Sequence, residues 1–161
     1  MPNEAKQNFP ELVERSFAFL VREHRFRCTK AEPDWVRYES TKVFIDILYS
    51  ITGPLADHAV LIMFGRLGRV GEDLAFSDFL FRLNPQFIKS LGEMIVWKPE
   101  QLGDLVERLA HALQSHGSDI LQGKEEIFEM MQKCHWPFKK KRRFGSLSEA
   151  LRRLFKRSGT K

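Results

Sequence analysis

Residues 35–50 read WVRYESTKVFIDILYS, and this stretch decides the fold. In residues 43–49 apolar side chains recur at every second position, which is typical of a strand with one face on a core. Residues 35–39 alternate in the same way, and only a short Ser40–Thr41 step separates the two runs. The stretch therefore predicts two neighbouring antiparallel strands. The alternating positions are Val36 and Tyr38 against Trp35, Arg37 and Glu39, and then Val43, Ile45, Ile47 and Tyr49 against Phe44, Asp46 and Leu48.

Two flanking stretches extend this pattern. RFRCT at residues 25–29 places Phe26 and Cys28 on one face, and HAVLIMFG at residues 58–65 is apolar almost throughout, as a strand covered on both faces would be. The intervening KAEP and ITGPLAD segments are rich in turn residues. We therefore expect an antiparallel meander of three to four strands.

Helical periodicity appears on both sides of the meander. Residues 8–24 carry an apolar stripe at helical spacing, and Asn8 and Pro10 suit the cap and first turn of that helix. After residue 73 the pattern stays helical, with its longest run in residues 98–122. The predicted fold class is α+β: an N-terminal helix, the meander, then a helical C-terminal half. We expect one domain over residues 1–136, followed by a basic linker and short amphipathic helix in 137–161.

The charge is divided unevenly along the chain. The formal net charge is +5, but residues 139–161 contain ten Lys and Arg and one Glu, whereas the first 138 residues carry sixteen Lys and Arg against twenty Asp and Glu. The body is thus mildly acidic and the tail strongly basic. No apolar run approaches the ~18 residues that a membrane span requires, and the N-terminus lacks the pattern of a signal peptide. We expect a soluble cytoplasmic protein.

The nucleophiles and metal ligands form no recognisable motif. Cys28 alternates with Phe26 and is expected in the core, and Cys134 and His135 are neighbours that point in different directions on a helix. His111 and His116 are five residues apart, which gives a single ligand pair at best. We therefore expect no catalytic residue, no bound cofactor and no metal site, and so a protein that is not an enzyme.

The glycine-rich segment GRLGRVG at residues 65–71 has two interpretations. Its glycines could let backbone N–H groups approach a phosphate, and the GRLG unit has the shape of a loop that clamps nucleic-acid backbone. However, the spacing matches neither phosphate-loop pattern, and the acidic Glu72 and Asp73 follow it. A turn that ends the sheet is the favoured interpretation.

The tail combines a basic block with a short predicted helix. Ser146 and Glu149 form a capping-box pattern, and Leu147, Leu151, Leu154 and Phe155 then share one helical face. The tail could dock on the acidic body, bind a polyanion, or lie on a membrane surface, which a face of four apolar residues without Trp does not favour. The candidate polyanion-binding residues are Lys139, Lys140, Lys141, Arg142, Arg143, Arg152, Arg153, Lys156 and Arg157.

One family resemblance covers residues 9–83. FPELVERSFAFLVREHRFRC, WVRYESTKVFIDILYS, AVLIMFGRLG and FSDFLF together resemble small bacterial helix-plus-meander proteins that are similar to toxin-immunity proteins. The resemblance implies a protein that binds and blocks a cognate toxin. It transfers no toxin-binding residue. The expected function is therefore non-enzymatic binding of a protein partner, with a nucleic-acid accessory protein that uses the basic tail as the alternative.

Overall fold

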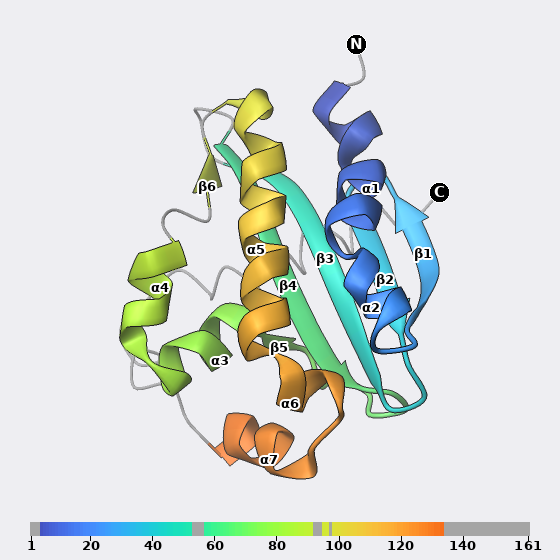
Figure 1. Cartoon of the computed structure of the whole chain (residues 1–161), viewed down its shortest axis with the longest axis vertical. Helices are drawn as coiled ribbons and strands as arrows, with labels where there is room; N and C mark the ends of the chain where they lie inside the picture. Colours follow the sequence, from blue (N-terminus) through green and yellow to red (C-terminus); the bar gives the residue numbers. More distant parts are fainter. Residues whose placement is uncertain (1–3, 53–56, 92–94, 97, 134–161) are drawn as a thin grey trace.

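The computed structural model of the chain describes residues 4–52, 57–91, 95–96 and 98–133. Its centre is an antiparallel meander of four long strands, β1 (Arg27–Glu32), β2 (Trp35–Glu39), β3 (Val43–Thr52) and β4 (Asp57–Arg66), which pair in chain order (Figure 1). The β3–β4 ladder extends over the full length of both strands, from Val43 opposite Arg66 to Thr52 opposite Asp57.

The outer edge of β4 carries two very short strands. β5 (Leu74–Ala75) pairs with Met63 and Phe64, and β6 (Ile95–Val96) pairs with His58 and Ala59 at the other end of the same strand. Helices α3 (Phe76–Leu83) and α4 (Pro85–Leu91) connect them. Two helices, rather than a longer paired strand, therefore lie beside β4 at this edge of the sheet.

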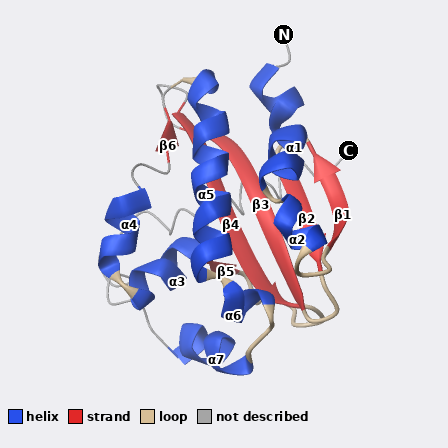
Figure 2. Ribbon diagram, in the orientation of Figure 1, coloured by secondary structure: helices blue, strands red, loops and turns tan. Residues whose placement is uncertain are grey.

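The remaining helices cover one face of the sheet. In Figure 2, α1 (Glu4–Ser16), α2 (Ala18–Arg22) and α5 (Leu102–His116) lie in front of the strands. The short 3-10 helix η1 (Pro99–Gln101) leads into α5, and α6 (Ser118–Leu121) and α7 (Glu125–Lys133) follow it near the end of β4.

The core lies between this helical layer and the sheet. Val13 and Phe17 of the N-terminal helices, Leu105, Leu109 and Leu113 of α5, and Ile45 and Ile47 of β3 are almost fully buried in one cluster. The apolar stripe of each helix and every second residue of each strand thus meet in one layer, as their periodicities require.

The predicted fold class is confirmed, whereas two local predictions are wrong. Asn8 does not cap the first helix, because α1 already begins at Glu4 and continues through Pro10. Lys30, Ala31 and Glu32 belong to β1 rather than to a turn. The predicted helical run of residues 98–122 is helical, with a break at Gly117 between α5 and α6. In the described part of the chain, no helix is both long and apolar enough to span a membrane.

Candidate functional site

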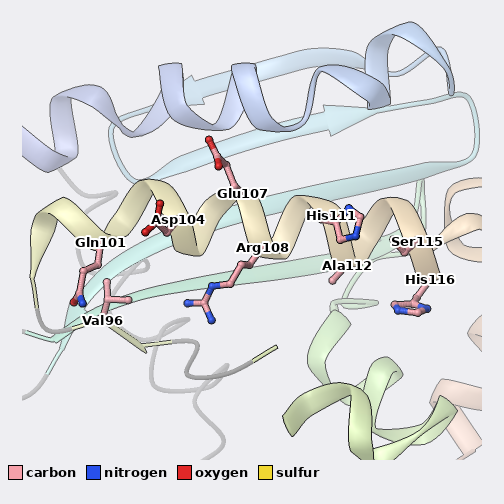
Figure 3. Close-up of a pocket in the computed structure, with 9 residues that line it drawn as sticks. All are labelled: Val96, Gln101, Asp104, Glu107, Arg108, His111, Ala112, Ser115 and His116. Carbon is pink, nitrogen blue, oxygen red and sulfur yellow. The ribbon is translucent and has the colours of Figure 1, made fainter. Parts of the chain in front are cut away.

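A groove runs along the outer side of α5 and has a volume of about 810 Å³. Helical periodicity explains its lining. Leu105, Leu109 and Leu113 turn one side of α5 into the core, so the polar residues between them face outward. The lining comprises Val96, Gln101, Asp104, Glu107, Arg108, His111, Ala112, Ser115 and His116 (Figure 3).

The charged side chains of the groove lie at different positions along α5 and on two sides of it. Figure 3 shows Asp104 and Glu107 pointing toward α1, while Arg108 and His116 point to the opposite side. Glu107 forms an exposed ion pair with Arg15 of α1, with a 3.6 Å N–O distance. Such an exposed pair contributes at most about 1 kcal/mol, so Glu107 can exchange Arg15 for another cation at little cost.

The two histidines of α5 have different surroundings. The His116 ring stacks on Phe87 of α4 with 4.2 Å between ring centroids, whereas His111 is exposed on the helix surface. Across the described ranges of the chain, no group of three His, Cys, Asp or Glu side chains is placed to hold a metal ion. Most of the side chains that line the groove are charged or can form hydrogen bonds.

An ion pair between Arg66 and Glu72 joins the two ends of the glycine-rich loop. β4 ends at Arg66, and Gly68 and Gly71 adopt the left-handed conformation with φ of 78° and 80° before β5 begins. Both carboxylate oxygens of Glu72 accept hydrogen bonds from Arg66, at 2.7–2.9 Å. The Arg66 side chain is 12% exposed and that of Glu72 is 5% exposed. The loop is thus a turn at the end of β4, and it leads into a strand rather than into a helix.

Helix α7 completes this ion-pair cluster. Glu125 also pairs with Arg66, and Gln132 donates a hydrogen bond to Glu72 over 2.8 Å. The hydrogen bond to Glu72 is the main reason that the pKa of Arg66 is raised, and its guanidinium also lies 5.2 Å from the Phe128 ring. Arg66, one of the two arginines of this loop, is therefore held by two carboxylates. The sequence analysis did not predict this cluster. Its members lie up to sixty-six residues apart, and only the folding of the chain brings α7 next to the loop.

The prediction that Cys28 lies in the core is wrong. Cys28 is exposed on β1, and its thiol donates a hydrogen bond to the backbone carbonyl of Lys30 over 3.4 Å. Phe26 precedes the strand and is buried, while a register irregularity between Cys28 and Lys30 breaks the simple alternation. An edge strand with such a bulge does not keep the period-two pattern on which the prediction depended.

Two further histidines, His58 and His24, pack against aromatic rings. His58 is buried, its Nδ1 shares a hydrogen bond with the Tyr49 hydroxyl, and the Tyr49 ring stacks on Phe9. His24 packs edge-on against Phe19. Cys134, His135 and all nine candidate polyanion-binding residues lie outside the described residues.

Comparisons with known proteins gave no relative for this chain. No protein-family model matches the sequence. No curated protein matches it. No solved structure matches the fold at a significant level.

Proposed function

We propose that this chain is a non-enzymatic binding protein that acts by covering part of a protein partner. The most specific form of the proposal is immunity-type neutralisation, in which the partner is a toxin. The groove along α5 is the observation that carries it. An outward row of acidic, basic and imidazole side chains on a long helix, without a metal-binding cluster in the described residues, suits recognition of a folded surface.

The charge of the body indicates the kind of partner. The first 138 residues have four more acidic than basic residues, and Asp104 and Glu107 project from the N-terminal half of α5. A basic partner would be attracted to this side, and complementary charge mainly accelerates association and excludes wrong partners. A positively charged nuclease toxin has the matching chemistry.

Charge reversal in the groove tests this proposal. Full-length Asp104→Lys/Glu107→Lys would be compared with wild type by immobilising each and identifying retained proteins from the source cells by mass spectrometry. A matched control, Glu126→Lys/Glu129→Lys, makes the same charge change on exposed residues of α7. We expect a basic protein that wild type and control retain and the groove variant loses. Equal retention by all three chains would contradict the proposal.

A second candidate function rests on the tail. Residues 139–161 concentrate ten Lys and Arg with one Glu, which suits binding to the phosphates of a nucleic acid without sequence preference. Fluorescence anisotropy of a labelled RNA and a labelled DNA duplex would compare the full chain with a chain ending at Trp136. Nucleic-acid binding predicts an affinity that requires the tail and falls by orders of magnitude between low and physiological salt. Identical weak signals from both chains would exclude it.

A further inference from the structure

The sheet has a second face, opposite the helical layer. We define this second face as the residues that alternate with the core positions on β2, β3 and β4. Its rows follow the strand register: Trp35, Leu48 and Leu61 form one row, and Arg37, Asp46 and Met63 the next. Phe44 and Gly65 lie at one end, and Ser50, Ala59 and Asp57 at the other.

Two apolar residues of the second face, Leu61 and Met63, are buried although they lie outside the main core cluster. Leu61 is 8% exposed and Met63 is 5% exposed. In the described part of the chain, these two side chains form a cluster of their own with Leu48 and Ala75, all from the sheet, with no helical residue in it. The helices drawn in Figures 1 and 2 for the described residues lie in front of the sheet or beside it, so none of these helices covers the second face.

Two polar atoms on the same face point to what the cover provides. Ser50 Oγ and Asp57 Oδ1 are buried and have no hydrogen-bond partner among the described residues. Both residues occupy second-face positions near the end of the β3–β4 ladder, one register row apart. A buried carboxylate oxygen without a donor is costly, and Arg or Lys supplies the strongest donors for it.

We propose that residues 146–157 of the same chain dock on this second face. Leu147, Leu151, Leu154 and Phe155 form the apolar stripe of that predicted helix, which matches the cluster of Leu48, Leu61 and Met63. Arg152 and Arg157 border the stripe and would supply cations to Asp57. A three-turn helix is marginal by itself, so an apolar surface that covers its stripe is what would make it stable.

The chain is long enough to reach the face. α7 ends at Lys133 and is held beside the end of β4 by the contacts of Arg66 with Glu125 and of Glu72 with Gln132. The twelve residues 134–145 can extend over about 40 Å. Along β4, Leu61 lies about 17 Å from Arg66, at the usual rise per residue of a strand. A tether of this length gives an effective concentration on the order of millimolar, so moderate affinity is enough for docking.

Site-directed photo-crosslinking on the full chain tests the docking. The photoreactive residue p-benzoylphenylalanine is placed at Leu154, within the apolar stripe. For the control it is placed at Arg153, which lies outside the apolar stripe, about 100° around the predicted helix from Leu154. We expect crosslinks from position 154 to Leu48, Leu61 or Met63 of the same chain, in roughly tenfold greater yield than from position 153, since a decade in occupancy corresponds to about 1.4 kcal/mol.

Variants of both partners make the test specific. Leu48→Lys on the face and Leu151→Asp in the tail should each lower the yield about tenfold, since each places a charge in an apolar contact. Leu151→Asp leaves the body unchanged, so this variant still tests the docking even if Leu48→Lys fails to fold. Leu83→Lys, at an exposed position of α3, should leave the yield unchanged. Crosslinks to a second copy, to the helical layer, or in equal yield from positions 153 and 154 would overturn the proposal.

Discussion

The two faces of one sheet differ in how they are stabilised. On the core face, Ile45, Ile47, Ile62 and Phe64 are at most 2% exposed and pack in one cluster with the helices. On the second face, the centre is a charged group instead. Asp46 accepts hydrogen bonds from Trp35 Nε1 over 2.8 Å and from Arg37 Nε over 2.7 Å. Burial of apolar surface therefore dominates one face, and a polar network with a small apolar cluster organises the other.

The hydrogen bonds of Asp46 explain how the second face accommodates a buried carboxylate. The Asp46 side chain is 7% exposed, yet Arg37 also donates to its second oxygen over 2.6 Å, so neither oxygen lacks a donor. This hydrogen bond is the main cause that raises the pKa of Arg37. The guanidinium lies 4.5 Å above the Phe44 ring as well. A carboxylate can thus replace an apolar residue in the sheet only because the next strand supplies its partners.

The largest expected effect tests the contribution of apolar packing. Phe64→Ala removes a fully buried ring that contacts Phe79 and Phe128, with 6.3 and 5.8 Å between centroids. We expect the free energy of unfolding to fall by about 3–5 kcal/mol, measured by urea denaturation. Leu48→Ala, on the half-buried second face, should cost only about 1 kcal/mol. Equal losses in the two variants would remove the energetic difference between the faces.

A smaller effect is expected in the pH dependence of stability, through Tyr38 and Tyr49, which both lie on the core face. Burial raises the pKa of Tyr49 to about 12, and burial raises the pKa of Tyr38 as well. An unfolded tyrosine has a pKa of about 10, so the folded state holds its proton more tightly. The resulting stability is fully present below about pH 10 and is lost as the pH rises through about 12 for Tyr49.

Tyrosinate absorbance in a pH titration measures this shift. Both tyrosines should ionise above pH 10 in the folded chain, together with unfolding, whereas the same titration in denaturant should show ordinary values near 10. If either side chain ionises near pH 10 while circular dichroism still shows a folded chain, the core face is more accessible to water than its packing indicates.

The smallest expected effect compares two glycines of the loop region. A Cβ on Gly65 would lie 1.9 Å from the Glu72 carbonyl oxygen and 2.6 Å from Phe44 Cζ, whereas no atom of the described residues lies within 4 Å of one on Gly68. Gly65→Ala should therefore cost about 1–3 kcal/mol through forced displacement. Gly68→Ala should cost about 1 kcal/mol, because φ is 78° there. Thermal unfolding of both variants checks the order, and a milder effect at Gly65 would mean that the loop moves freely away from the sheet.

The sequence predicted the elements better than the site. The period-two runs located β2 and β3, because half-buried strands must alternate, and the continuous apolar run of residues 58–65 located β4. The same rule failed at Cys28, where a bulged edge strand has no second neighbour to enforce alternation. The Arg37–Asp46 and Arg66–Glu72 pairs were not predicted. A signal existed for the first pair, since an acidic residue interrupts the apolar alternation of β3 and a basic residue does so on β2, but only the strand register shows that they are opposite.

By itself, the sequence determined the α+β class, the meander, the order of the helices and the separation of an acidic body from a basic tail. These follow from local spacing and composition, which each segment carries alone. Only the tertiary structure decided which face of the sheet the helices cover, that Glu72 is paired with Arg66, and that the outer side of α5 forms a groove. Such features depend on which residues from distant segments meet, and that is set by the packing of the whole chain rather than by any local pattern.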